Sequence, residues 1–406
     1  MNPVRTDQVV GQRLELRPAD LHVVVEDVAP RVVAPAADAV GDEERARLVA
    51  EEPLSLLRVL GPEGRDGAAA GRVAGDRIRE LIAAGRFDHV GPALAFHELR
   101  RGEHRQLGLV AEVPIRHRDD GTVRPHEATR SHHERALAEF VEAAGMDISP
   151  VALTYRARPS VDEATAAVTA AEPDLAFAGW GGLEHRVWVV RDGDTIAGLL
   201  DAFEGVDQLT IVDGHHRVAA AARRAEHRGD DTTTFLAELF PDRDLGFASY
   251  DRCVTLPAGV PATSFLDRLR GVGPVAPLPG PPRRPTERLE AVVFVDGAWY
   301  GLTFGDAPDQ VPEGLGVVLL QERVLGPLLG IEDPRTDDRL VTVPGTAPLD
   351  ELADRCSAGH RVAFALPPVS LDELQEVAAR GTVLPPKSTY NDPKAGPGVF
   401  IRLRPR

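Results

Sequence analysis

The stretch that decides the fold is Leu209-Thr210-Ile211-Val212-Asp213-Gly214-His215-His216-Arg217. Its first four residues are a short β-branched run typical of a buried strand. Residues 218–228 are rich in alanine and favour a helix, which Gly229 would end. We therefore predict that residues 213–217 form a tight turn from a strand into a helix.

Such a turn has the chemistry of an anion site. The first backbone N–H groups of a helix have no partner within the helix and attract negative charge. Gly214 would let a ligand approach the backbone, and His215, His216 and Arg217 would add donors. We predict a phosphate- or carboxylate-binding turn. The alternative is an ordinary Asp-Gly turn with two solvated histidines, and the chain has neither a P-loop nor a dinucleotide-binding glycine motif.

The composition is typical of a globular chain of two or three domains, with 406 residues, 43% hydrophobic and 27% charged. A net charge of −17 disfavours nonspecific attraction to nucleic acid. No apolar run is long enough for a membrane span, and we expect no signal segment. We expect a cytoplasmic protein with neither nucleic-acid nor membrane partners. Cys253 and Cys356 lie far apart without metal-ligand spacing, so we predict no disulfide framework.

The two lysines of the chain lie together. They are the first and last residues of Lys387-Ser388-Thr389-Tyr390-Asn391-Asp392-Pro393-Lys394, whereas the other 44 of the 46 basic residues are arginines. Lysine and arginine are not equivalent at a phosphate or catalytic position. The clustering predicts a place that requires a compact ammonium group, with chance as the alternative.

A second chemical landmark is His126-Glu127, just before a predicted helix. Arg130 stands where a zinc protease would have its second histidine, so that motif is incomplete. Glu127 on a loop is suited to act as a base or to hold a metal, and the alternative is a solvated acidic residue. Capping boxes are predicted at Ser131 with Glu134 and at Ser160 with Glu163.

The remaining pattern predicts a mixture of strands and helices. A Gly/Ala-rich stretch at residues 64–75 precedes an expected helix at residues 77–84. Other helices are predicted at residues 43–51, 131–144, 160–171 and 370–379, and strands near residues 21–26, 93–96, 107–111, 186–190, 235–240, 291–295, 299–302 and 362–366. The fold class is α/β (α+β), divided into an N-terminal part at 1–115, a core at 116–255 and a C-terminal part at 256–406.

Taken in order, these motifs resemble the prokaryotic domain-of-unknown-function family 1015 nearly end to end. The matching segments are Pro35-Ala36-Ala37-Asp38, Glu52-Pro53-Leu54-Ser55-Leu56, His126-Glu127-Ala128-Thr129, Ser149-Pro150 to Tyr155, His185 to Trp188, the Asp213–Arg217 motif, and Pro385-Pro386-Lys387-Ser388-Thr389-Tyr390 with Pro393-Lys394. The chain departs from the family pattern at Ala36 and Ala37, where the family has proline and tyrosine, and at Asn391, where it has an aromatic residue.

The region from His126 to Arg217 also resembles the free-serine kinases of the ParB/sulfiredoxin superfamily. This resemblance implies a ParB/sulfiredoxin-like mixed-sheet core with flanking α+β parts. It also implies that the Asp-Gly-His-His-Arg motif holds nucleotide phosphates and that Glu127 takes the proton of the serine hydroxyl. Phosphoryl transfer requires donors around phosphate, usually Mg²⁺, and a carboxylate aimed at the hydroxyl.

The site residues expected on this basis fall into groups. The catalytic group is Glu127, Asp213 and His216, and the cofactor-binding group is Gly214, His215, His216, Arg217, Lys387, Ser388 and Thr389. Asp213 is the expected Mg²⁺ ligand. Further motif residues are His126, Thr129, Asp38, Tyr390 and Lys394, of which Asp38, like Lys387, is expected to reach the central site from a flanking part.

The leading functional hypothesis is a small-molecule kinase that uses ATP or ADP with Mg²⁺ to phosphorylate the hydroxyl of free serine or a related metabolite. Two alternatives remain open at this point. One is a non-catalytic protein that binds a nucleotide or effector at the same turn. The other is a metal-dependent hydrolase with His126, His215 and His216 as ligands.

Overall fold

The computed structural model describes residues 13–36, 39–59, 66–127, 131–229, 232–257, 259–279, 282–357 and 361–404. The chain forms two compact units, each built from separate stretches of sequence. Unit 1 comprises residues 1–124, 131–245 and 393–406, and unit 2 comprises residues 125–130 and 246–392. The predicted three-part division of the chain stays a prediction.

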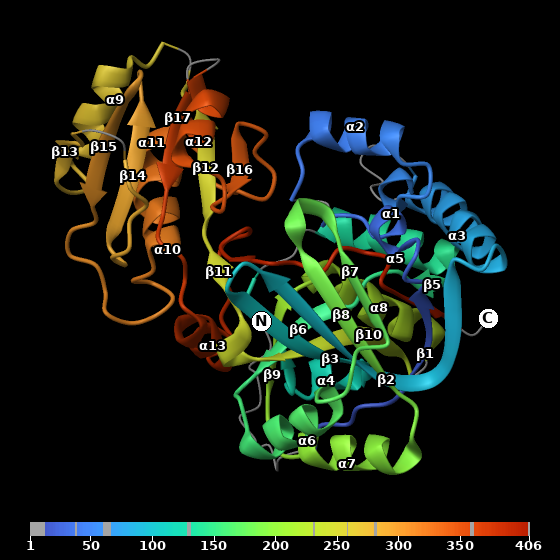
Figure 1. Ribbon diagram of the computed structural model, residues 1–406. Coiled ribbons are helices and arrows are strands. Elements are labelled where there is room, and N and C mark those ends of the chain that lie inside the picture. Colours follow the sequence, from blue (N-terminus) through green and yellow to red (C-terminus); the bar gives the residue numbers. More distant parts are fainter. Residues whose placement is uncertain are drawn as a thin grey trace. The chain divides into compact units, whose positions relative to one another are not determined.

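Unit 1 is built on an eleven-stranded mixed sheet (Figure 1). Its strands are β1 (Ala19–Val24), β2 (Phe87–Arg101), β3 (His104–Pro114), β4 (Val123–Arg124), β5 (Met146–Asp147), β6 (Val151–Tyr155), β7 (Leu175–Ala178), β8 (Glu184–Val190), β9 (Leu209–Asp213), β10 (Thr234–Pro241) and β19 (Phe400–Leu403). Strand β2 is long enough to pair with β1 through its first half and with β3 and β8 through its second half. The order is β4-β9-β6-β10-β3-β2-β1-β19-β5, with β8 and β7 continuing from β2. The expected mixed-sheet α/β fold is confirmed.

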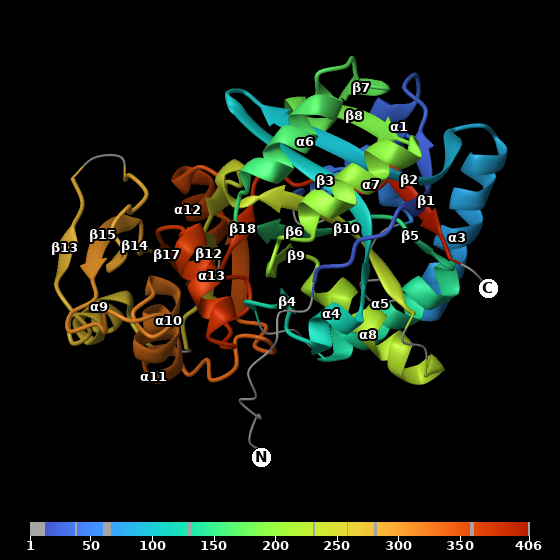
Figure 2. The same cartoon turned by 90° about the horizontal axis from the view of Figure 1, so that it is seen from below.

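The helices of unit 1 connect and cover these strands. They are α1 (Ala29–Val32), α2 (Asp42–Glu51), α3 (Gly67–Ala83), α4 (Arg116–Asp119), α5 (Ser131–Ala144), α6 (Pro159–Thr169), α7 (Gly193–Phe203) and α8 (His215–Arg228), with short 3₁₀ turns η1 (Leu56–Arg58), η2 (Trp180–Gly182) and η3 (Asp242–Asp244). Helices α6 and α7 lie side by side in both views (Figure 2). The predicted strand and helix around residue 214 are confirmed as β9 and α8, and Gly229 ends α8 in the left-handed conformation.

Helix α3 corrects one prediction. The Gly/Ala-rich stretch is helical from Gly67, ten residues earlier than expected, and Asp66 caps it by accepting from the amides of Ala68 and Ala69. Gly67 and two further glycines at four-residue spacing, Gly71 and Gly75, face helix α5. A Cβ at these positions would come within 2.3, 2.2 and 2.6 Å of carbonyl oxygens of α5. Close packing of the two helices therefore outweighs the low helix propensity of glycine.

The start of helix α6 corrects the predicted capping box at Ser160. The helix begins at Pro159 after Arg158, which makes no side-chain cap, so Ser160 lies inside the helix and forms no capping box. Proline suits the first helical position because it needs no amide partner there. Asp38, Thr129 and the side chains of Ser131 and Glu134 lie outside the described residues. Among the described residues, no helix is long and apolar enough to cross a membrane.

Unit 2 contains a six-stranded antiparallel sheet of order β13-β15-β14-β17-β12-β16 and a two-stranded sheet of β11 and β18. The strands are β11 (Phe247–Ala248), β12 (Tyr250–Thr255), β13 (Val275–Pro277), β14 (Glu290–Val295), β15 (Ala298–Thr303), β16 (Leu340–Pro344), β17 (Arg361–Ala365) and β18 (Tyr390–Asn391). The helices are α9 (Ala262–Leu269), α10 (Gly316–Leu320), α11 (Gly326–Leu329), α12 (Leu349–Ser357) and α13 (Leu371–Ala379), with a π-helical segment η4 (Gln321–Leu325). The strands predicted near residues 291–295 and 299–302 are confirmed as β14 and β15, which Asp296-Gly297 joins in a hairpin. The helix predicted at residues 370–379 is confirmed as α13, and Ser370 is its N-cap.

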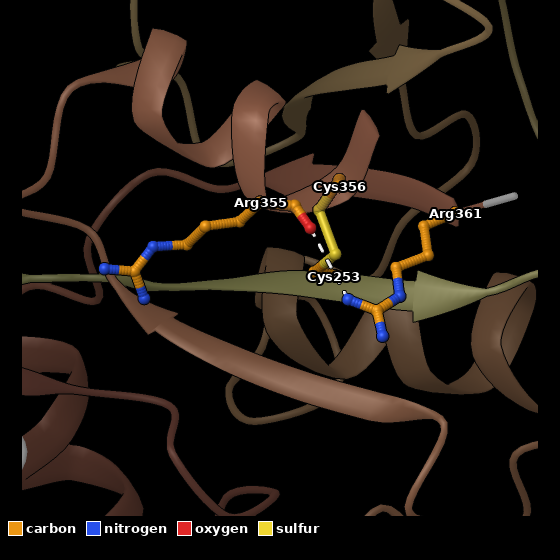
Figure 3. Close-up of a disulfide and its surroundings, with 4 residues drawn as sticks. All are labelled: Cys253, Arg355, Cys356 and Arg361. Atoms are coloured by element: carbon orange, nitrogen blue, oxygen red, sulfur yellow. Dashed lines mark hydrogen bonds between the residues drawn. A yellow bond between two sulfur atoms is a disulfide. The ribbon is translucent and has the colours of Figure 1, made fainter. Parts of the chain in front are cut away.

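A disulfide in unit 2 corrects the cysteine prediction. Cys253 on β12 and Cys356 on α12 are bonded, with their Cα atoms 5.9 Å apart (Figure 3). Both residues are buried in a small core between strand and helix. Their separation of 103 positions gave no sign of this proximity, because the fold brings α12 onto β12.

Candidate functional site

The turn after β9 has the geometry that only glycine adopts easily. Gly214 has φ 98° and ψ 26°, and it precedes the first residue of α8. A Cβ at this position would also come within 2.8 Å of Arg217 Nε. The glycine therefore permits the turn and leaves room for the Arg217 side chain to fold back against the backbone.

Asp213 lies between two cations. Its Oδ2 accepts a hydrogen bond from Arg217 Nη2 at 2.6 Å, and its Oδ1 accepts one from Lys394 Nζ at 3.0 Å. The Lys394 side chain is 9% exposed and the Asp213 side chain 34%. Two cationic side chains therefore meet at this carboxylate, in a chain whose net charge is −17. Lys394, the second lysine of the Lys387–Lys394 stretch, therefore belongs to the charged cluster around Asp213.

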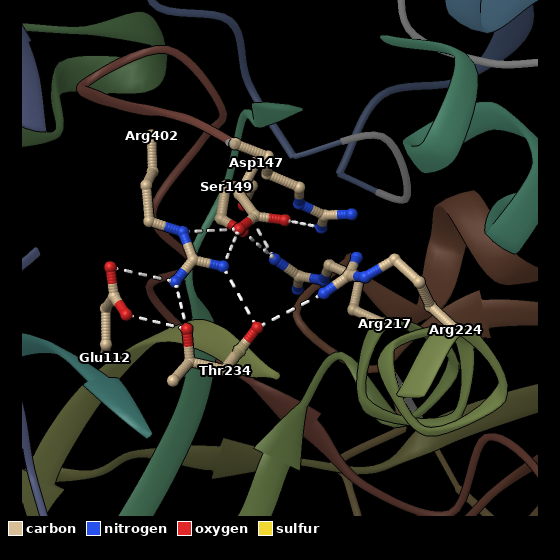
Figure 4. A network of polar contacts seen from close by, with 8 residues as sticks. Glu112, Asp147, Ser149, Arg217, Arg224, Thr234 and Arg402 are labelled. Atoms are coloured by element: carbon tan, nitrogen blue, oxygen red, sulfur yellow. Dashed lines mark hydrogen bonds and ion pairs between the residues drawn. The ribbon is translucent and has the colours of Figure 1, made fainter. Parts of the chain in front are cut away.

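Arg217 is held by the loop before β6. Its Nη1 donates to the carbonyl oxygen and hydroxyl of Ser149 at 3.0 and 2.8 Å (Figure 4). It also donates to the carbonyl oxygen of Pro150. Together with Asp213, these acceptors occupy one edge of the guanidinium group. Arg217 therefore fixes the position of Asp213 relative to the Ser149–Pro150 segment, which is one of the family-like segments.

A dense ionic network supports the same loop. Asp147 pairs with Arg402 and Arg404, and Arg402 also lies 3.1 Å from Glu112 and 2.7 Å from the hydroxyl of Thr234 (Figure 4). Burial alone would raise the pKa of Asp147, but Arg402 and Arg404 outweigh burial and hold that pKa below its usual value. The network ties β5, just before Ser149, to β19, β3 and β10.

The two motif histidines start helix α8. His215 is buried at 9% exposure, and His216 is half-buried. The structure therefore brings together six of the expected residues in unit 1, namely Asp213, Gly214, His215, His216, Arg217 and Lys394. This arrangement offers a helix start and a nearly buried ammonium group, both of which favour an anion.

Unit 2 holds the other expected residues that the structure describes, namely His126, Glu127, Lys387, Ser388, Thr389 and Tyr390. His126 is fully buried, and its Nε2 lies in a hydrogen bond of 2.9 Å with the Thr389 hydroxyl. The His126 carbonyl accepts from the Leu384 amide at 2.8 Å, and Glu127 forms an isolated bridge with Leu384. These contacts anchor the His-Glu segment to the chain that leads into the Lys-Ser-Thr-Tyr motif.

Lys387 contacts a tyrosine that the sequence did not single out. Its Nζ donates to the Tyr250 hydroxyl at 3.0 Å and lies 4.8 Å from that ring's centre, and the Tyr390 ring meets Tyr250 edge-on. Lys387 has φ 59°, a left-handed conformation that is uncommon for a lysine. Ser388 is fixed by a hydrogen bond from its Oγ to the Pro385 carbonyl at 2.5 Å.

Arg252 is a second residue missed from the sequence. It is buried at 2% exposure, and its Nη2 donates to the carbonyl oxygens of Pro386 and Lys387 at 3.2 and 2.8 Å. Burial lowers its pKa to about 10, while the charges of Glu127 and Asp251 act in the opposite direction. The only available signal was a charged pair, Asp251-Arg252, inside a predominantly buried strand.

Metal binding lacks a ligand set in the described part of the chain. No group of three or more His, Cys, Asp or Glu residues there could hold an ion. The hydrolase alternative therefore has no metal centre among the described residues.

Comparisons with known proteins give one family and several solved structures. The family described as "Protein of unknown function (DUF1015)" matches residues 16–321. No curated protein matches the chain. A free serine kinase in complex with AMP has 15% identity and a TM-score of 0.41, with 73% of this chain and 91% of that chain covered.

Two further solved structures have comparable values. A conserved hypothetical protein from Pyrococcus furiosus has 15% identity and a TM-score of 0.39, and the match covers 73% of this chain and 95% of that chain. SbnI with a C-terminal truncation, from Staphylococcus aureus, has 12% identity and a TM-score of 0.40, with 72% and 87% covered. Because the family match spans well over half of the sequence and includes the Asp213–Arg217 turn, the chain belongs to the DUF1015 family.

Proposed function

We propose that this protein is a small-molecule kinase that transfers a phosphoryl group from ATP or ADP to the hydroxyl of free serine or a related metabolite. The observation that carries the proposal is the pairing of Lys394 and Arg217 with Asp213 at the start of α8. Phosphoryl transfer depends on positioning and on positive charge around the phosphate, and this turn supplies both.

The phosphate of the nucleotide is proposed to bind at the start of α8. Lys394 and the helix dipole are proposed to supply positive charge there. His215 and His216 are proposed as further donors. Arg217 acts as a positioning residue in this proposal, since its contacts with Ser149, Pro150 and Asp213 already define its orientation.

Glu127 is proposed as the base that takes the proton of the acceptor hydroxyl. Its support is the family-like His-Glu segment, the half-buried position of the residue and its charge interaction with the buried Arg252. Lys387, Ser388 and Thr389 are proposed to contact the nucleotide. Their contacts with Tyr250, Pro385 and His126 set the conformation of this segment.

The described residues do not fit a protein-held Mg²⁺ ion. Both oxygens of Asp213 are engaged by cations, and no cluster of ligands lies elsewhere in the described ranges. Magnesium is often carried mainly by nucleotide phosphates, with few protein ligands. The proposed roles of the residues above therefore do not depend on a metal ligand.

Nucleotide turnover by the purified full chain tests the proposal. ATP and ADP are supplied in turn with Mg²⁺ and a panel of hydroxyl metabolites that includes serine, and phosphorylated product is detected by mass spectrometry. Glu127→Gln should lower kcat by at least about 100-fold, as expected for loss of a general base. The matched control, Glu51→Gln, changes an exposed carboxylate on α2 and should leave turnover unchanged.

Two outcomes would count against the kinase. Turnover that is equal in Glu127→Gln and wild type would remove Glu127 from the chemistry. Nucleotide-induced thermal stabilisation with no acceptor-dependent turnover across the panel would favour the non-catalytic nucleotide-binding alternative.

A further inference from the structure

Two alternate residues of β12 hold the same lysine of unit 2. The Tyr250 hydroxyl accepts from Lys387 Nζ at 3.0 Å, and Arg252 Nη2 donates to the Lys387 carbonyl oxygen at 2.8 Å. Alternate residues of a strand point to the same face, so both side chains reach Lys387 from one face of β12. Lys387 is therefore held both at its ammonium group and at its backbone.

The guanidinium group of Arg252 binds three backbone oxygens. Its Nη1 donates to the Tyr250 carbonyl at 3.2 Å, and its Nη2 donates to the Pro386 carbonyl at 3.2 Å as well as to the Lys387 carbonyl. A guanidinium group presents its donors in a rigid planar fork, whereas a lysine ammonium is a point charge on a flexible stem. The fork therefore fixes the Pro386–Lys387 backbone against β12.

The backbone of Lys387 depends on such contacts. Its φ of 59° lies in the left-handed region, which is unfavourable for a residue with a Cβ. A conformation of this kind persists where the surrounding structure holds it. The bond from Arg252 to the Lys387 carbonyl is one of the contacts that hold it, and the bond from Ser388 Oγ to the Pro385 carbonyl is another.

Arg252 is a buried cation whose charge is balanced within unit 2. Burial lowers its pKa to about 10, and the charge of Glu127 is the largest contribution in the opposite direction. The Asp251 side chain points to the other face of β12, and both of its oxygens accept from Arg284 at 2.9 Å. Glu127 is therefore the principal counterion of Arg252.

The segment that carries Lys387 also binds the segment that carries Glu127. The Leu384 amide donates to the His126 carbonyl at 2.8 Å, and the Thr389 hydroxyl lies in a hydrogen bond of 2.9 Å with His126 Nε2. Residues 384–389 are thus tied to His126 near both ends and to Arg252 between them. Arg252 interacts with both segments, with Lys387 through a hydrogen bond and with Glu127 through its charge.

We propose that Arg252 is a positioning residue that sets Lys387 and Glu127 relative to each other for phosphoryl transfer. Its fork fixes the backbone from which the Lys387 ammonium group extends, and its charge attracts the Glu127 carboxylate. The positioning is a property of unit 2 by itself, whereas its use in phosphoryl transfer rests on the proposed function. A lysine at residue 252 would keep the charge and lose the fork, so substitution can separate the two contributions.

Lysine NMR on the full chain tests the positioning directly. Because the chain has two lysines, lysine labelled with ¹³C at Cε gives two signals, and Lys387→Arg assigns them. The Tyr250 ring, whose centre lies 4.8 Å from Lys387 Nζ, should displace the Lys387 signal from its position in the denatured chain. We expect Arg252→Met to remove most of this displacement and to leave the Lys394 signal unchanged. Arg270→Met, a change at an exposed arginine, should alter neither signal.

Arg252→Gln provides a second variant in case Arg252→Met fails to fold. Glutamine can donate to a carbonyl oxygen but has neither the fork nor the charge, so the Lys387 signal should move toward its denatured position here too. A Lys387 signal that is not displaced in wild type would overturn the proposal. A Lys387 signal that is the same in wild type and in the folded variants would also overturn it.

Turnover by Arg252→Lys separates the fork from the charge. With Lys387 displaced and Glu127 still facing a cation, the KM for the nucleotide should rise by at least about fivefold while kcat changes less. In Arg252→Met, which loses both contributions, kcat should also fall by at least about tenfold. A merely structural role would lower stability but leave KM, and kcat per folded molecule, as in wild type.

The activity of the wild type separates this inference from the proposed function. If the wild type transfers no phosphoryl group to any acceptor in the panel, the proposed function fails, and the Lys387 signal alone decides whether Arg252 positions this segment. If the wild type is active and the variants move the Lys387 signal without changing KM or kcat, the role of Arg252 in transfer is contradicted and the kinase stands.

Discussion

Lys394 Nζ donates to Asp213 Oδ1 at 3.0 Å, although 181 positions separate the two residues. The bond places one of the two lysines of the chain at the strand-to-helix turn that the sequence singled out. It also connects two family-like motifs within unit 1. A compact ammonium group fits here because the other side of Asp213 is already occupied by the guanidinium group of Arg217.

Arg217→Lys should destabilise the protein by about 1–3 kcal/mol, because a lysine cannot span the acceptors on Ser149, Pro150 and Asp213. The free energy of unfolding in urea measures this loss. Arg13→Lys is the matched control, since Arg13 is mostly exposed and bonds only to Glu204 among the described contacts. Equal stability of the two variants would show that Arg217 does not hold the turn.

Gly214→Ala should lower the free energy of unfolding by about 1–3 kcal/mol, because φ 98° is strained for alanine and the new Cβ would meet Arg217 Nε. Gly198→Ala serves as the control, since it adds a methyl group on helix α7 with no atom within 4 Å. Thermal unfolding compares the two. A Gly214→Ala protein as stable as wild type would contradict the described turn.

Reduction of the Cys253–Cys356 bond should destabilise unit 2. The bond closes a loop over 103 positions, for which the chain-entropy estimate is about 4–5 kcal/mol. Urea unfolding with and without dithiothreitol measures the difference, and the Cys253→Ser, Cys356→Ser double variant should not respond to dithiothreitol. Detection of two free thiols in the denatured, unreduced protein would contradict the pairing.

Asp147→Asn should change how the free energy of unfolding falls as the pH becomes acidic. Arg402 and Arg404 hold the folded-state pKa of Asp147 below 3.8, so its stabilising contribution is complete above pH 3.8 and is lost as the pH falls through the lower folded value. Asparagine removes this contribution, which lowers stability at neutral pH and flattens the decline in acid. Urea midpoints between pH 2.5 and pH 7 test this, with the exposed Asp267→Asn as control. Parallel profiles would contradict the assignment.

The sequence predicted those parts of the fold that local patterns determine. Strands β9, β14 and β15 and helices α8 and α13 follow from patterns among neighbouring residues, and the structure has each of them. The early start of α3 was missed because its glycines are explained only by the close approach of α5. The disulfide was missed for a similar reason, since only the packing of α12 on β12 joins the cysteines.

The candidate site was predictable in composition but not in arrangement. The motifs identified Asp213, Arg217 and Lys394, yet nothing in their spacing indicated that both cations would bind the same carboxylate. Tyr250 and Arg252 carried no motif, because their roles arise from contacts with Lys387 across more than 130 positions. Long-range contacts of this kind depend on the whole fold.

The most direct test of the central claim is calorimetric titration of ADP into the full chain. The account predicts saturable binding to wild type and an affinity at least tenfold weaker in Lys394→Met, which removes the ammonium group beside Asp213 but keeps an unbranched side chain of similar length. Arg13→Met should bind ADP as wild type does. ADP that fails to bind wild type, or that binds Lys394→Met equally well, would contradict the claim that this turn holds phosphate.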